Sequence, residues 1–140
     1  QIIINPHCKH CALHYKEWLR LDTSVSLLFS VSDRNRQDKE VALAVISCYI
    51  RHGFRQAMDL LGEWFDKHDT GLIIHYPLVP QAEQVLEAQR AYCNKIHLQH
   101  TPFITINERK MPGIYTIKIL FANKSQAIRA VHIATKLFMI

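Results

Sequence analysis

The chain has 140 residues, 49% of them hydrophobic and 21% charged, which fits one globular domain and argues against a disordered chain. Its formal net charge of +5 favours weakly acidic partners but is too small to indicate a nucleic-acid-binding protein. No run of about eighteen apolar residues is free of charge, which excludes a transmembrane helix.

The first predicted element is a short strand. Ile2-Ile3-Ile4 is a β-branched run, and Asn5-Pro6 ends it with a turn signal. Gln1 is not an initiator Met, and no basic leader precedes the strand, so a signal peptide is not indicated. We therefore expect the chain to be a domain of a longer polypeptide.

A helix and a second strand follow. The helix is predicted from Cys8 to about Leu21, because Cys11, Tyr15 and Trp18 recur at helical spacing. Residues 24–31 have a hydrophobic centre typical of a buried strand.

A long helical block occupies the middle of the chain. The first helix carries an apolar stripe from Val41 and ends at Gly53, a natural C-cap. A second helix runs from Phe54 to about Lys67, and a third from Gln81 to Asn94, with a connector between them.

The period then changes to two. Residues 103–107 predict a strand, Glu108-Arg109 a hairpin turn, and Met111-Pro112-Gly113 the end of the returning strand. The predicted helices after it cover residues 115–123 and 127–139. This order of elements indicates a single α/β domain with a mixed central sheet.

The C-terminal segment 124–140 has two readings. Its apolar stripe is flanked by Lys124, Arg129 and Lys136, as in helices that lie on acidic membranes. The same stripe is typical of a helix that packs on its own domain, which is the reading we favour.

Cys8 and Cys11 form a C-x-x-C motif between the first strand and the first helix. A thiol at a helix N-terminus meets unpaired backbone N–H groups, which favour the thiolate. Lys9 and His10, between the two cysteines, add positive charge. We therefore expect Cys8 to be the nucleophile and Cys11, one turn further along, to be the resolving thiol.

The cysteines also allow a zinc half-site that His7, His10, Cys48 and Cys93 would complete. Structural zinc sites usually show a second close pair of ligands, and no such pair is present, so the redox interpretation is favoured. Cys48 and Cys93 could pair as a structural disulfide, or remain buried free thiols, which is the usual outcome.

Thr101-Pro102 precedes the strand at residue 103. A proline there is usually only a strand boundary, but cis X–Pro bonds are also found in tight turns at working sites. The order of elements permits this dipeptide to lie beside the C-x-x-C motif, and the neighbouring His100 could then influence the redox pair.

These motifs carry a resemblance. Segments 3–12 and 101–107, with Pro112-Gly113, resemble thioredoxin-fold proteins, in particular the DsbA-like branch and the domains fused to bacterial vitamin K epoxide reductase homologues. The resemblance implies a thioredoxin fold: a mixed four-stranded sheet within one domain, 1–140, and a helical insertion at about 36–95 between its βαβ and ββα halves.

The resemblance also implies a function. Cys8 and Cys11 would exchange disulfides with cysteine-containing proteins or peptides, most readily oxidising dithiols, without cofactor or metal. His10 would stabilise the thiolate, and Thr101 and Pro102 would bind an extended substrate, whereas Lys9 replaces the family's usual proline. A membrane vitamin K epoxide reductase-like partner would re-oxidise the pair, outside the bacterial cytoplasm. The alternative is a zinc-stabilised or peptide-binding module without redox catalysis.

Overall fold

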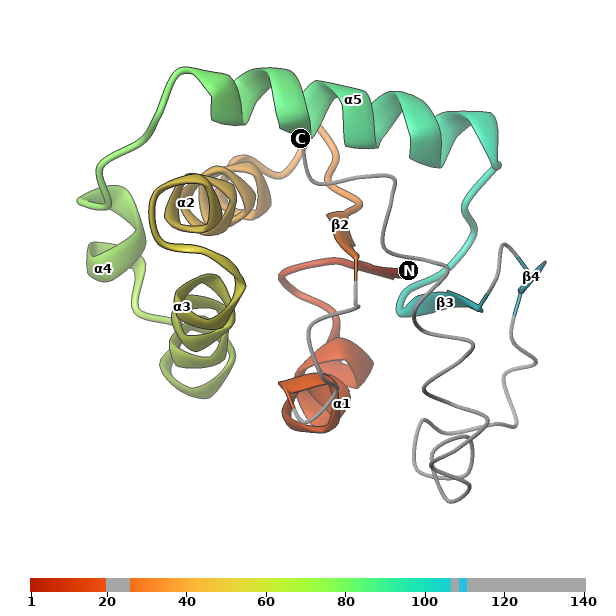
Figure 1. Ribbon diagram of the computed structural model, residues 1–140, viewed down its shortest axis with the longest axis horizontal. Coiled ribbons are helices and arrows are strands. Elements are labelled where there is room, and N and C mark those ends of the chain that lie inside the picture. Colours follow the sequence, from red (N-terminus) through yellow and green to blue (C-terminus); the bar gives the residue numbers. More distant parts are fainter. Residues whose placement is uncertain (20–25, 107–108, 111–140) are drawn as a thin grey trace.

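Helices hold most of the residues that the structure describes (Figure 1). This computed structural model describes residues 1–19, 26–106 and 109–110. In chain order the helices are α1 (Lys9–Leu19), α2 (Arg36–His52), α3 (Phe54–Lys67), α4 (Thr70–Ile74) and α5 (Gln81–Lys95).

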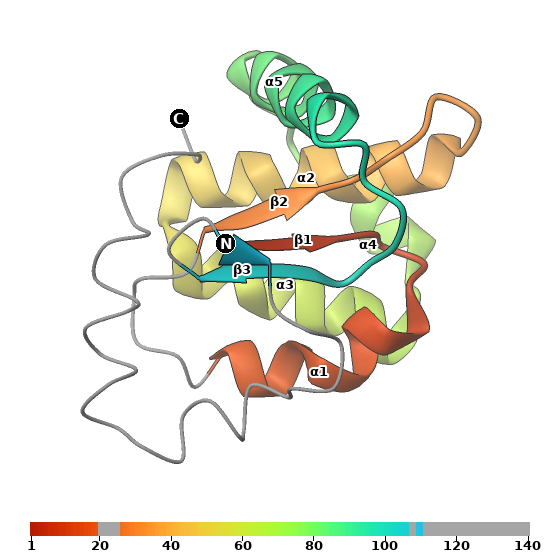
Figure 2. The same ribbon diagram turned by 90° about the vertical axis from the view of Figure 1, so that its right-hand side faces the viewer.

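The strands are short. β1 (Ile2–Ile4) pairs in parallel with β2 (Leu27–Phe29) on one side and antiparallel with β3 (Phe103–Ile106) on the other. A further strand, β4 (Arg109–Lys110), forms a two-residue antiparallel ladder with β3, so the order is β2-β1-β3-β4. The strands β2, β1 and β3 lie side by side in Figure 2.

The predicted thioredoxin-fold sheet of four strands is wrong. The described residues are mostly helical, and their sheet is a mixed one of three strands, each of three or four residues, to which β4 adds only its two-residue ladder. The physical reason is the distribution of apolar side chains. Most of the buried hydrophobic residues lie on α1, α2, α3 and α5, and only brief runs favour strands.

The two faces of the sheet pack against different helices. Side chains alternate between faces along a strand, so Ile2 and Ile4 join the main core with residues of α1, α2 and α3. Ile3 and Leu28 point the other way and pack with Cys93 of α5 in a smaller cluster. In Figure 1, α2 and α3 lie side by side, with α5 and α1 beyond them, in agreement with their contacts.

The helical block was predicted in outline. The expected helices ending at Gly53, near Lys67 and near Asn94 are confirmed as α2, α3 and α5. The connector contains a helix that was not predicted, α4, whose N-cap Asp69 accepts a hydrogen bond from Leu72 N at 3.1 Å. The helices expected at 115–123 and 127–139, and the tail 124–140, lie outside the described residues.

The register of the sheet places the candidate site. Ile3 lies opposite Phe103, so the residues before β3 run toward the carboxyl end of β1, where α1 begins. None of the helices in the described ranges is long and apolar enough to cross a membrane.

Candidate functional site

Cys8 occupies the N-cap position of α1. The helix starts at Lys9, and the Cys8 carbonyl accepts the first helical hydrogen bond, from Ala12 N at 3.1 Å. The Cys8 Sγ accepts from Cys11 N at 3.2 Å, which is the bond that a capping side chain makes. A sulfur in this position meets the backbone N–H groups at the positive end of the helix.

Cys11 lies directly behind Cys8, where it is fully buried. Burial raises the pKa of the Cys11 thiol well above its usual range, and the hydrogen bond and charge of Cys8 raise it further. Hydrogen bonds from the Asn5 backbone and the Thr101 side chain act in the opposite direction without cancelling the rise. The two thiols are therefore unlike: Cys8 is half-buried and reachable, whereas Cys11 is shielded and stays protonated.

Thr101 completes the site from the other half of the chain. The Thr101–Pro102 peptide bond is cis, as the motif resemblance implies. The Cys8 thiol donates to the Thr101 carbonyl oxygen, with the sulfur 3.3 Å from the oxygen. The structure thus brings Cys8, Cys11 and Thr101 together, although 93 positions separate Cys8 from Thr101.

Lys9 and His10 are both exposed on the first turn of α1. Lys9 adds a positive charge next to Cys8 in the chain. His100, which we expected to adjoin the redox pair, is exposed and lies edge-on to Phe103, with their ring centroids 6.0 Å apart.

The residues of the predicted zinc alternative are not brought together. Cys48 lies in the main core and Cys93 in the small cluster beside α5, and all four cysteines are free thiols. Within the described ranges, no three His, Cys, Asp or Glu side chains form a group that could hold a metal ion. The structure therefore also shows no Cys48–Cys93 disulfide.

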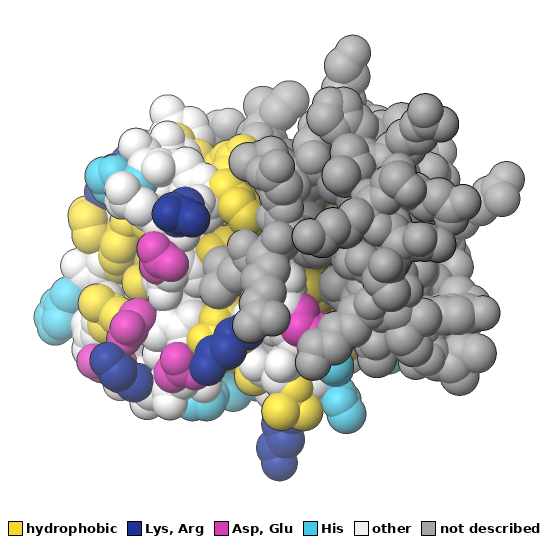
Figure 3. Space-filling view, turned by 60° about the horizontal axis from the view of Figure 1, so that its bottom comes forward, with side chains coloured by type: hydrophobic (Ala, Val, Ile, Leu, Met, Phe, Trp, Pro, Cys, Tyr) yellow, Lys and Arg dark blue, Asp and Glu magenta, His cyan; other side chains and the backbone are white. Residues whose placement is uncertain are grey.

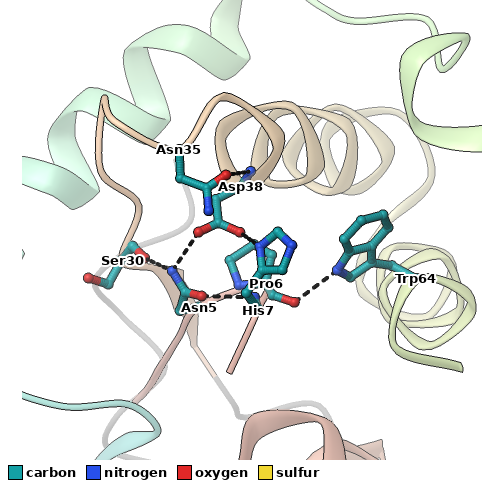
Figure 4. Close-up of polar contacts among 7 residues, drawn as sticks. All are labelled: Asn5, Pro6, His7, Ser30, Asn35, Asp38 and Trp64. Atoms are coloured by element: carbon teal, nitrogen blue, oxygen red, sulfur yellow. Dashed lines mark hydrogen bonds and ion pairs between the residues drawn. The ribbon is translucent and has the colours of Figure 1, made fainter. Parts of the chain in front are cut away.

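A polar cluster around Asp38 was missed by sequence reasoning (Figure 4). Asp38 is 3% exposed, in the first turn of α2, and it pairs with His7 and accepts from Asn5 Nδ2 at 3.0 Å. From the other side, Trp64 Nε1 donates to the Pro6 carbonyl oxygen at 2.9 Å. The N-cap pattern Asn35-x-x-Asp38 could have indicated the start of α2, but nothing local indicates that this carboxylate is buried.

An open groove lies elsewhere on the molecule, between α2, α3 and α4. Its lining includes Tyr15, Asp59, Glu63, Asp66 and Tyr76, and it contains neither Cys8, Cys11 nor Thr101. The groove therefore does not belong to the cysteine site.

On the face shown in Figure 3, acidic and basic side chains of the described residues are interspersed.

Comparisons with protein-family models, with curated proteins and with solved structures found no match to this chain.

Proposed function

We propose that this protein catalyses thiol–disulfide exchange on cysteine-containing proteins or peptides. The observation that carries the proposal is the position of the Cys8 sulfur at the N-cap of α1, between Cys11 N and the Thr101 carbonyl. This sulfur is half-buried at a helix N-terminus, and a second thiol lies one helical turn behind it. These are the parts that exchange through a mixed disulfide requires.

The reaction balances in both directions without a cofactor. The Cys8 thiolate attacks one sulfur of a substrate disulfide, the substrate S–S bond breaks, and the departing sulfur keeps the electron pair and takes a proton. Cys11 then attacks the Cys8 sulfur, the mixed disulfide bond breaks, and the second substrate sulfur leaves with the electron pair and takes up the proton that Cys11 gives up, which leaves a Cys8–Cys11 disulfide. In reverse, the Cys8–Cys11 disulfide accepts two electrons from a substrate dithiol.

The geometry favours the oxidising direction. A helix N-terminus stabilises the Cys8 thiolate, and stabilisation of the reduced form makes the disulfide form a stronger oxidant. By the motif resemblance, Lys9 and His10 would act in the same sense, and Thr101 and Pro102 would bind an extended substrate. By the motif resemblance, the protein would act outside the cytoplasm, where disulfides persist. A membrane vitamin K epoxide reductase-like partner would re-oxidise Cys8 and Cys11.

The first test is an exchange assay combined with metal analysis. The wild-type protein should accelerate both the reduction of insulin by dithiothreitol and the refolding of a scrambled disulfide protein, and a Cys8→Ser/Cys11→Ser variant should do neither. Cys48→Ala, which keeps both site cysteines, serves as the matched control and should retain activity. One tightly held zinc ion per reduced chain, with no acceleration of either reaction, would favour the zinc-module alternative and reject the proposal.

A further inference from the structure

The loop that delivers Cys8 to α1 is held from three sides. Asn5 Nδ2 donates to the Ser30 carbonyl at the end of β2, at 3.0 Å, and to Asp38 of α2. His7 pairs with the same carboxylate, and its ring lies edge-on to Trp64 of α3, with ring centroids 5.8 Å apart. Figure 4 shows Asp38 between Asn5 and His7, with Trp64 on the far side of Pro6.

Asp38 is the centre of this arrangement. A buried carboxylate is costly unless its oxygens are satisfied, and both oxygens of Asp38 face donors from the loop. Its own backbone N–H donates to the N-cap Asn35 at 3.1 Å, so the start of α2 fixes the carboxylate in place. The contacts of this carboxylate thus join α2 to the loop that precedes Cys8.

Asn5 connects Asp38 to the two sulfurs. Its side chain contacts Asp38, while its backbone carbonyl accepts from Cys8 N at 3.0 Å, and its backbone acts to lower the pKa of the buried Cys11 thiol. The Asn5 Oδ1 accepts from His7 N at 2.8 Å, which closes a tight turn just before Cys8. A shift of Asn5 would therefore move the Cys8 backbone and change the surroundings of Cys11.

We propose that Asp38 is a positioning residue for thiol–disulfide exchange, acting through Asn5 and His7 to hold Cys8 at the N-cap of α1. This inference rests on the proposed function. Asp38 does not touch the reacting sulfurs in any contact described above, so its effect is geometric. A small misplacement of a reacting group is enough to slow a reaction severely.

The test measures the rate constant with which the fully reduced, folded protein attacks oxidised glutathione, and the equilibrium between the Cys8–Cys11 dithiol and disulfide in glutathione buffer. Asp38→Ala and Asn5→Ala should each lower the rate constant by about tenfold or more. The effects of the two changes should be less than additive in the double variant, because both break the contact between Asp38 and Asn5. Asp38→Asn, which keeps an acceptor for Asn5, should restore most of the rate.

Ser47→Ala is the matched control. Ser47 is fully buried on the same helix and accepts from Val79 N at 3.1 Å, so its loss removes a buried polar contact of α2 far from the loop. It should lower stability without changing the rate or the equilibrium. Should Asp38→Ala fail to fold, His7→Ala, at an exposed position, removes one of the two contacts and should still slow the attack severalfold.

The inference would be overturned if folded Asp38→Ala, or His7→Ala, attacked oxidised glutathione at the wild-type rate and kept the wild-type dithiol–disulfide equilibrium. Fully additive effects of Asn5→Ala and Asp38→Ala on the rate constant would also overturn it. Failure of the proposed function is a separate result, because it is read on the wild type: a wild-type protein that forms no Cys8–Cys11 disulfide in glutathione buffer rejects the function before any variant is compared.

Discussion

A Cys11→Ser variant is expected to accumulate a covalent adduct on Cys8 when it is mixed with a disulfide-containing peptide, at about one peptide per chain. The half-buried Cys8 sulfur remains available for attack, while a serine hydroxyl at position 11 does not displace a sulfur from the mixed disulfide. Turnover should fall to the uncatalysed rate. Intact-protein and peptide mass spectrometry would identify the adduct and its position.

Cys8→Ser is the decisive companion to this variant. It should form no adduct, because the remaining site thiol, Cys11, is fully buried and has a raised pKa. Cys93→Ser is a suitable control, because Cys93 is buried in a separate cluster beside α5, so its removal should leave turnover intact. An adduct on Cys11 or Cys93, or none at all in Cys11→Ser, would contradict the assigned roles.

The second large effect is expected at Trp64. This indole is 1% exposed in the main core, so Trp64→Ala should lower the free energy of unfolding by about 3–5 kcal/mol. Trp64→Phe keeps most of the ring contacts but removes the hydrogen bond to the Pro6 carbonyl. This substitution should lower the free energy of unfolding by about 1–3 kcal/mol because the carbonyl is left unsatisfied, and the smaller ring should lower it further. Urea denaturation measures both variants.

Trp18 supplies the comparison for Trp64. It is also fully buried, but its Nε1 has no hydrogen-bond partner among the residues that the structure describes. Trp18→Phe removes the same atoms without breaking a hydrogen bond, so it should be less destabilising than Trp64→Phe. Equal costs for the two phenylalanine variants would mean that the bond to Pro6 contributes nothing measurable.

Local patterns were sufficient for much of the chain. The β-branched run at Ile2–Ile4 and the helical spacing of Tyr15 and Trp18 correctly indicated β1 and α1. The start of α1 was placed at Cys8, whereas the helix begins at Lys9 with Cys8 as its N-cap. Cysteine is not among the usual capping residues, so this role could not be predicted from preference alone.

The extent of the sheet could not be predicted in the same way. Residues 24–31 suggested a longer strand than Leu27–Phe29, and Arg109, which we expected in the hairpin turn, already belongs to β4. Strand length depends on which partners the chain offers across the sheet, and such pairings are non-local. The order of elements permitted Thr101 to lie beside Cys8, and the motif resemblance made that proximity an expectation.

Asp38 shows most clearly what a sequence pattern leaves out. An acidic residue in the first turn of a helix is ordinarily an exposed neighbour of the helix dipole. Here it is buried, and its partners Asn5 and His7 lie 33 and 31 positions away. Only the folded structure reveals that this carboxylate contacts the loop that precedes Cys8.

The most direct test of the central claim is a redox titration of the wild-type protein in glutathione buffers, with thiols alkylated after acid quenching and located by peptide mass spectrometry. We expect one two-electron transition in which Cys8 and Cys11 become linked to each other, while Cys48 and Cys93 remain thiols throughout. A protein in which Cys8 and Cys11 stay unlinked across all buffers, or in which Cys8 forms only glutathione adducts, would contradict the proposed function.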